Sequence, residues 1–235
     1  ALGNNLATTE GELMAMAQRM ASTGELAGMS NEAILALAAG LTHVGINAEA
    51  GGSAAGKLMK QMQLAGETGR RAMQEFSEYS ETAGLSARDL QLAADSSEWV
   101  EATAIDLGRT KNEVKDMVAS MVALEQFSGV MNVTPAQFIA GWNENAGQSI
   151  LDFFIGLNEI ETSTGEESVL SKLQEMGLTE IRLSNMIAAA AANPDIFVRA
   201  MEISNEAYEQ NTALAEEAEK RYATAESYQR MQLNR

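Results

Sequence analysis

Residues 28–62 read GMSNEAILALAAGLTHVGINAEAGGSAAGKLMKQM, and this stretch contains the signals for one helix end, one complete helix and the start of another. Gly28 can adopt the left-handed conformation that ends a helix, and the Ser30 hydroxyl can accept hydrogen bonds from the first free amides of the next helix. Apolar residues then recur at steps of three and four, which predicts a helix from Asn31 to about His43. Gly45 ends it, and a third helix is expected to begin near residues 51–53.

The rest of the chain has the composition of a helical protein. The 235 residues are 46% hydrophobic, with only 2 Pro, 6 Phe, 4 Tyr and 2 Trp. Alanine, leucine, methionine and glutamate are common, whereas valine and isoleucine seldom alternate with polar residues. We therefore expect an all-α, multi-helix globular array of helical hairpins that ends in a long C-terminal helix.

Charge and cysteine content restrict the possible partners. The chain has 33 acidic and 16 basic residues, a net charge of −17, which opposes binding to a phosphate backbone. The nearest basic pair, Arg70 and Arg71, is too small to be a nucleic-acid patch. There is no cysteine, and no apolar run is long enough to cross a membrane. We expect no nucleic-acid and no membrane binding by this segment.

Further helix starts follow the same local rules. Thr9 with Glu12 and Thr110 with Glu113 have the spacing of capping boxes, and Pro135 suits the first position of a helix. Glycines at 66 and 69 predict a break before another helix at 70–83. The most hydrophobic helix, expected to be central, contains five large apolar residues, namely Ile150, Leu151, Phe153, Phe154 and Leu157.

The helix-opening device at Gly28 recurs three times. A residue that tolerates the left-handed conformation is followed by an apolar residue, then by a hydroxyl residue that caps the helix. The copies begin at Gly84, Asn132 and Gly177, and their hydroxyl residues are Ser86, Thr134 and Thr179. The intervals between copies are unequal, so a helical hairpin reused with drift fits better than a strict solenoid. Reuse of a common turn by an unrelated helical protein remains an alternative.

The last helix is predicted to begin at Pro194 after Asn193 and to continue toward Arg235 without a break. We therefore divide the chain into a helical core domain, residues 1–193, and a long C-terminal helix, residues 194–235, that leads into a coiled rod. One face of this helix is apolar but formed by small side chains, which suits a single partner helix. The predicted self-association seam consists of Ile203, Ala207, Leu214, Ala218, Tyr222 and Ala225.

No residue pattern predicts catalysis, a metal ion or a cofactor. GGSAAGKL at 51–58 nearly matches a phosphate-binding loop, but Leu58 replaces the required hydroxyl and no strand precedes it. His43 is the single histidine, so neither a metal site nor a nucleophile with its base can be assembled around it, and we expect it to interact with the end of its own helix. We expect no enzyme and no small-molecule substrate.

Three stretches carry a family resemblance. AGMS with VGINAEAGGSA near residues 27–55, FIAGWNENAGQSILDFFIGL at 138–157 and EMGLTEIRL at 175–183 resemble the core region of phage tail tape measure proteins. The C-terminal segment is similar to the part of such proteins that continues into a long coiled rod. The family members are far longer, so we expect this chain to be a fragment of a larger protein.

The resemblance implies a structural role in a phage or prophage tail. Tape measure proteins determine tail length, template assembly of the tail tube and leave the tube during genome delivery. The implied partners are further copies of the same chain, the tail tube protein, tail assembly chaperones and tail tip proteins. The implied location is the virion tail, with the host cytoplasm during assembly. The alternative hypothesis is a helical protein interaction module of a bacterial regulator or effector.

Overall fold

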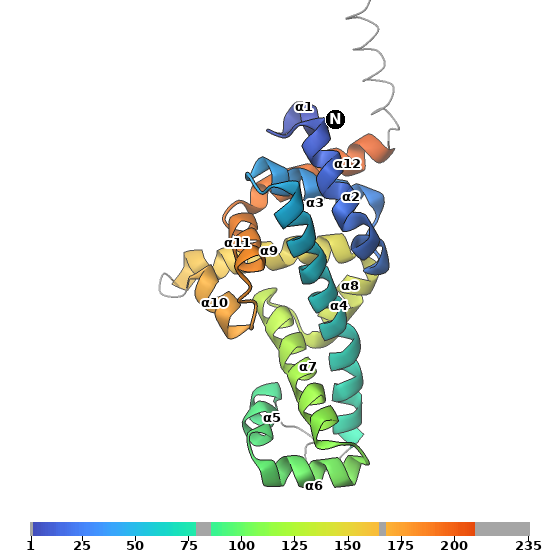
Figure 1. Cartoon of the computed structure of the whole chain (residues 1–235), viewed down its shortest axis with the longest axis vertical. Coiled ribbons are helices and arrows are strands. Elements are labelled where there is room, and N and C mark those ends of the chain that lie inside the picture. The colour runs from blue at the N-terminus through green and yellow to red at the C-terminus, as the bar shows by residue number, and fades with distance from the viewer. Residues whose placement is uncertain (1, 79–85, 165–167, 210–235) are drawn as a thin grey trace, which may run out of the picture.

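The computed structural model describes residues 2–78, 86–164 and 168–209. These residues form helices joined by short connections, with no strand among them (Figure 1). The prediction of an all-α, multi-helix globular fold is confirmed. The helices are α1 (Leu2–Asn5), α2 (Glu10–Leu26), α3 (Asn31–His43), α4 (Ala48–Glu78), α5 (Ala87–Ala94), α6 (Ser97–Leu107), α7 (Lys111–Val130), α8 (Pro135–Glu144), α9 (Ala146–Thr164), α10 (Val169–Glu175), α11 (Ile181–Ala191) and α12 (Pro194–Glu209).

The turn from α2 to α3 has the predicted geometry. Gly28 has a φ of 79°, and the Met29 N–H donates to the Gly24 carbonyl at 2.9 Å, which satisfies an end of α2. Ser30 then caps α3 by accepting a hydrogen bond from the Ala33 N–H at 3.2 Å. Met29 and Ile34 are both buried. A hydrophobic pair at these two positions fixes the angle at which the chain enters α3.

The later copies of this device agree in part. Asn132 is left-handed with a φ of 53°, and Thr134 forms a capping box with Gln137. Ser86 forms one with Asp89, whereas Gly84 and Leu85 lie outside the described residues. The prediction for Thr179 is wrong, because α11 starts one residue later with Glu180 as its N-cap and has no side-chain cap.

Helix α4 differs most from the prediction. It begins after Asn47, whose side-chain oxygen accepts from the Ala50 N–H at 2.9 Å, and continues unbroken for 31 residues. The expected start at residues 51–53 and the expected break at residues 66–69 are wrong. Their glycines lie inside the helix and are buried, since other helices approach α4 closely there.

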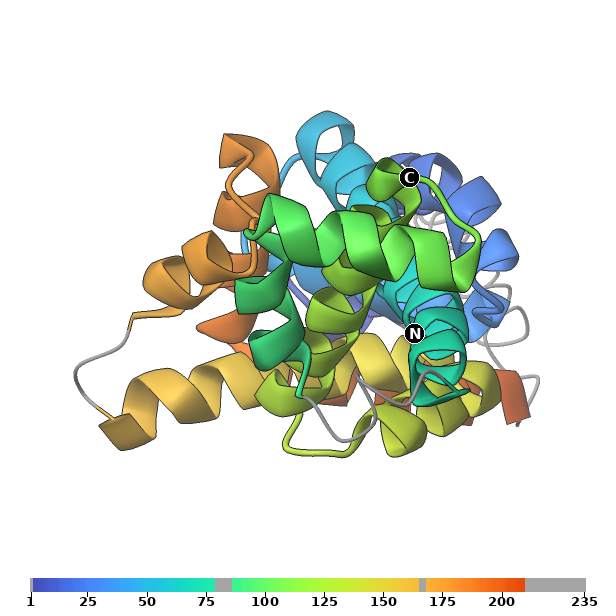
Figure 2. The same ribbon diagram turned by 90° about the horizontal axis from the view of Figure 1, so that it is seen from below.

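Two hydrophobic cores lie along α4. The main core surrounds its first half and is formed with α2, α3, α7, α8, α9, α10, α11 and α12. The distal core lies at its other end, where α6 crosses the lower end of the molecule (Figures 1 and 2). Its buried residues are Ala72, Phe76, Leu90, Val100, Ala104, Val114, Val118 and Met121.

Helix α9 lies within the main core, as predicted. Phe153, Phe154 and Leu157 are each at most 1% exposed. The ring of Phe153 meets Phe127 of α7 edge to face at a centroid distance of 5.3 Å, and Phe154 meets Phe197 of α12 at the same distance. Burial of such aromatic side chains supplies a large share of the hydrophobic stabilisation.

Helix α12 packs against α3 through its first turns. Phe197 and Ala200 are buried, and the Ser204 hydroxyl donates to the Glu32 carbonyl at 2.9 Å. Residues 194–209 are therefore attached to the helical core rather than separate from it. Residues 210–235 lie outside the described residues, so a continuation into a rod stays a prediction.

Candidate interaction surfaces

The predicted self-association seam is only partly within the described residues. Ile203 and Ala207 lie on α12 and are half-buried. They lie on the same face of α12 as Ile196 and Ala200, and these two residues pack in the small hydrophobic cluster that contains Leu6. The other four predicted positions, Leu214, Ala218, Tyr222 and Ala225, lie outside the described residues.

His43 ends α3, but its ring bonds a different segment from the one predicted. Its Nδ1 accepts a hydrogen bond from the Ala7 N–H at 2.8 Å, and the neighbouring Thr42 hydroxyl donates to the Thr8 hydroxyl at 2.8 Å. Leu6 beside them is buried. His43 therefore attaches the N-terminal segment to the core.

The stretch that resembles a phosphate-binding loop is helical in this chain. Residues 51–58 form the first turns of α4, so their amides belong to a helix rather than to a loop around an anion. A Cβ on Gly51 would lie 2.7 Å from Met16 Cε, and one on Gly52 would lie 2.6 Å from Arg19 Cβ. These glycines serve the close approach of α2 and α4.

The small residues that follow serve the same contact. Ala54 and Ala55 are each 2% exposed, and a Cβ on Gly56 would lie 3.2 Å from the Thr23 hydroxyl of α2. The unbroken helix and its buried small face agree with close packing.

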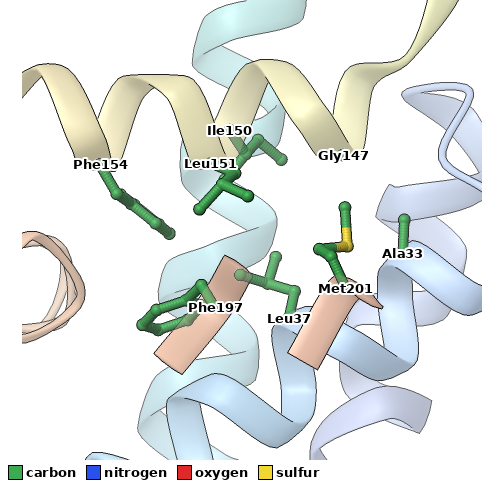
Figure 3. A pocket seen from close by; sticks show the side chains of 8 residues that line it. All are labelled: Ala33, Leu37, Gly147, Ile150, Leu151, Phe154, Phe197 and Met201. Carbon is green, nitrogen blue, oxygen red and sulfur yellow. The ribbon is translucent and has the colours of Figure 1, made fainter. Parts of the chain in front are cut away.

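A small apolar void lies between α3, α9 and α12 (Figure 3). Its volume is about 10 Å³, roughly the space that a single water molecule needs. The lining side chains contribute almost no polar surface, so a water there would lack hydrogen-bond partners. The void is a packing defect rather than a ligand site. It is lined by Ala33, Leu37, Gly147, Ile150, Leu151, Phe154, Phe197 and Met201.

Three open grooves lie beside α4. The first, which we name the α4–α11 groove, is between the middle of α4 and the turn from α10 to α11. Lys57 crosses it and forms an ion pair with Glu180 at 2.5 Å, with both side chains about half exposed. The lining residues are Lys57, Lys60, Gln61, Leu64, Gly177, Thr179, Glu180 and Leu183.

One large apolar side chain in the lining of this groove is exposed, and a second follows a lining residue in the sequence. Leu64 in its lining is 45% exposed, and Ile181, which follows Glu180, is 75% exposed. Exposed aliphatic side chains next to cationic ones are typical of a surface that binds an amphipathic partner. This surface was missed in the sequence, because its second wall, which includes Glu180, is more than a hundred residues away from Lys57 and Leu64 in the chain.

The second groove, between α4 and α7, is lined mainly by charged residues. Arg109 binds Glu75 through its Nη2 at 2.9 Å and lies 3.8 Å from Glu113. The Thr110 N–H and then the Thr110 hydroxyl, bonded to Glu113 at 2.7 and 2.8 Å, hold the pKa of that carboxyl below its usual range. These contacts join the start of α7 to α4.

The third groove lies between α4 and α8 and is more apolar. It is lined by Met73, which is 39% exposed, together with Arg70, Gln74, Ser77, Pro135, Ala136 and Ile139. Residues of both helices form its walls, but it has no pair of cations comparable to Lys57 and Lys60.

The described part of the chain has neither a cluster of metal-binding side chains nor a membrane-spanning helix. No cluster of three or more histidine, aspartate or glutamate side chains there has an arrangement that would bind a metal ion. None of the helices described there combines the length and the apolar character of a membrane-spanning segment.

Comparisons with models of protein families, with curated proteins and with solved structures gave no match to this chain.

Proposed function

We propose that this chain is the folded helical core of a tape measure protein from a phage or prophage tail. In this role it is a structural component that determines tail length, templates assembly of the tail tube and takes part in genome delivery. Its partners are further copies of itself, the tail tube protein, tail assembly chaperones and tail tip proteins. It acts in the virion tail and, during assembly, in the host cytoplasm.

The main support is the packing role of the residues that carry the resemblance. Gly51 and Gly52 of VGINAEAGGSA meet α2, and Gly147 of the second stretch meets Ala33 of α3. A Cβ on Gly156 in that stretch would lie 2.0 Å from the Val130 carbonyl oxygen. The glycines of two of the resembling stretches are therefore needed for helix contacts. This need explains why glycine occupies these positions.

The fold is compatible with this proposal. A structural protein needs a stable body and surfaces for partners, and the described residues provide two cores and open grooves along α4. The acidic net charge of −17 limits adhesion to nucleic acid that passes through the same tube.

The experiment that tests the proposal uses the phage or prophage that encodes this sequence. Peptides of this chain are expected in purified virions, in the tail fraction. In-frame deletion of helical sequence from the same gene is expected to shorten the tail in proportion to the residues removed. Absence of the chain from virions, or tails of unchanged length, would refute the proposal.

A matched pair of substitutions connects this test to the structure. Gly156→Ala is expected to abolish tails, because the added methyl group meets the α7 backbone. Gly129→Ala on α7 has no atom within 4 Å of its new Cβ and is expected to leave tail number and length unchanged.

The second candidate is a helical interaction module of a bacterial regulator or effector. The observation that favours it is the exposed side chain of Leu64 beside Lys57 and Lys60 in the α4–α11 groove. Detection of the chain in host cell extracts bound to a regulatory or secreted partner, and not in virions, would support this candidate over the first.

A further inference from the structure

Residues 2–8 form a short segment that only a few contacts hold to the core. Helix α1 has four residues, too few to be stable without tertiary contacts. The buried apolar side chain of the segment is Leu6, which is 7% exposed. It packs in a small hydrophobic cluster whose other buried members are Leu13 of α2, Ala36 and Ala39 of α3 and Ala200 of α12. Release of residues 2–8 would therefore uncover the part of α3 and α12 that Leu6 covers.

Two side chains at the end of α3 bind this segment. The Ala7 N–H donates to His43 Nδ1 at 2.8 Å, and the Thr42 hydroxyl donates to the Thr8 hydroxyl at 2.8 Å. The Thr42 hydroxyl has a single hydrogen, however, and the Ala38 carbonyl oxygen lies 2.9 Å from it as an alternative acceptor. Of the two contacts, the bond from Ala7 to His43 therefore holds the segment more directly.

The bond from Ala7 requires a neutral His43 ring. An N–H group can donate only to a ring nitrogen without a proton, so Nδ1 has its lone pair free and the proton of the neutral ring is on Nε2. In the imidazolium form both nitrogens carry protons, and two N–H groups would face each other. The charged ring is instead favoured by the negative end of the helix dipole, because His43 lies in the last turn of α3. Protonation therefore removes the bond to Ala7 without expelling the ring from the end of α3.

His43 is the only histidine in the chain, and histidine is the side chain that ordinarily changes charge between about pH 5 and pH 8. Carboxyl and guanidinium groups ordinarily titrate well outside this range. The ion pairs of the described residues join other side chains and do not include His43. A change of the segment in this range would therefore report on the imidazole ring.

The charged side chains around the end of α3 are carboxylates and one arginine. Phe197 of α12 lies against Gly40. Ser204, further along α12, bonds the Glu32 carbonyl at the other end of α3, so the start of α12 lies nearer to His43. The charged residues at the starts of the elements at this end are Glu10 and Glu12 of α2, Glu49 of α4, and Asp195 and Arg199 of α12.

We infer that His43 is a pH-sensitive switch that holds residues 2–8 against the core at neutral pH and releases them in mildly acidic solution. Above the titration range the neutral ring accepts the Ala7 N–H, and the segment covers the cluster around Leu6. As the pH falls through this range the bond is lost, and the alanine face of α3 and α12 becomes accessible. The inference concerns the isolated chain and does not depend on the proposed tail function.

Nuclear magnetic resonance of the full chain between about pH 7.5 and pH 5.5 tests this inference. Because there is one histidine, its ring Cε1–H resonance reports on His43 alone. Amide protection of Leu6 and Ala7, corrected for the intrinsic pH dependence of exchange, is expected to fall at least about fivefold, as loss of one hydrogen bond predicts. The midpoint is expected to coincide with that of the ring, and the methyl resonances of Leu6 and Leu13 are expected to shift with it.

His43→Asn is the matched control. The Oδ1 of asparagine is the same number of bonds from Cα as Nδ1 of histidine, it can accept the Ala7 N–H, and it does not titrate. This variant is expected to keep the protection of residues 2–8 at both ends of the range. His43→Lys, which carries a permanent charge and no acceptor, is expected to give low protection at both ends. Circular dichroism melting verifies that both variants are folded.

Several results would overturn the inference. Protection that does not change across the range would show that the bond to His43 is not needed to hold the segment. A midpoint that differs from that of the ring, or the same pH dependence in His43→Asn, would assign the effect to another group. A shift of the Ala7 amide with unchanged methyl resonances of Leu6 and Leu13 would show that the bond breaks while the segment stays attached.

Discussion

Gly156 lies where α9 passes the end of α7, and it allows the two backbones to touch. Gly156→Ala is expected to destabilise the fold by about 3 kcal/mol or more, because the methyl group would meet the backbone at Val130 and neither helix can yield easily. Chemical denaturation measures the loss.

The control for this substitution is Gly129→Ala, which replaces an exposed helical glycine with open space around it. It is expected to stabilise the protein by about 0.5–1 kcal/mol through the better helix propensity of alanine. Equal effects of the two substitutions would contradict the close contact of α9 with α7.

Three capping-box carboxylates give the stability a dependence on pH. The Thr9 hydroxyl and then its N–H hold the pKa of Glu12 below its usual value, and Ser86 lowers the pKa of Asp89 in the same way. The N–H and then the hydroxyl of Thr110 hold the pKa of Glu113 below its usual value. Because these pKa values are depressed in the folded state, their contribution is present above the unfolded values, about 4. It is lost as the pH falls through the folded values.

The variant Glu12→Gln, Asp89→Asn and Glu113→Gln tests this dependence. Gln137 already occupies the same position in the capping box of α8, where its side-chain oxygen accepts from the Thr134 N–H at 2.9 Å, so a neutral residue suits the motif. Stability of the variant is expected to fall less steeply between about pH 5 and pH 3 than that of the unmodified chain. An identical slope for both proteins would refute the assignment.

At the scale of the elements, α4 depends on glycines for its contacts. A Cβ on Gly69 would lie 2.8 Å from both Leu124 Cβ and the Ser120 carbonyl oxygen of α7, whereas one on Gly66 would meet only the Phe138 ring at 3.6 Å. Gly69→Ala is therefore expected to cost about 1–3 kcal/mol, and Gly66→Ala to be neutral or stabilising, in thermal melts of the two variants. A more harmful effect of Gly66→Ala would show that α4 is bent or broken there.

Helix starts were predictable from the sequence because a cap is a local feature. Thr9, Ser30, Thr110 and Thr134 each cap the helix that the sequence assigned to them. The continuity of α4 was not predictable by the same rules. A glycine that ends a helix and a glycine that admits a neighbouring helix have the same local signature, and only the position of α7 distinguishes Gly69 from a helix end.

At the scale of the whole molecule, the two cores are expected to differ in stability. Leu90 in the distal core and Leu157 in the main core are each at most 1% exposed, and Leu→Ala at a buried site costs about 2–5 kcal/mol. Leu90→Ala is expected to speed amide exchange in α5 and α6 while α3 and α9 keep their protection, because the distal core is small and lies at one end. Leu157→Ala is expected to reduce protection in both cores.

Hydrogen exchange monitored by mass spectrometry distinguishes these outcomes. Equal loss of protection in α9 for both variants would show that the molecule unfolds as one unit.

The division into two cores could not be read from the sequence. The apolar face of α7 is continuous, yet Val114, Val118 and Met121 belong to the distal core and Leu124 and Phe127 to the main one. Periodicity identifies which side of a helix is buried, but it has no information about which other helices bury it. The same limit applies to the α4–α11 groove, whose second wall is more than a hundred residues away in the chain.

Both α1 and the end of α12 lie at the upper end of the molecule (Figure 1), and this placement decides how the protein responds to tension. A force applied between Leu2 and Glu209 would act first on the contacts of α12 with α3, peeling them apart one after another. The distal core and the part of α4 and α7 that leads to it lie away from the line between these two ends (Figure 1). They would bear no load until the upper contacts had opened.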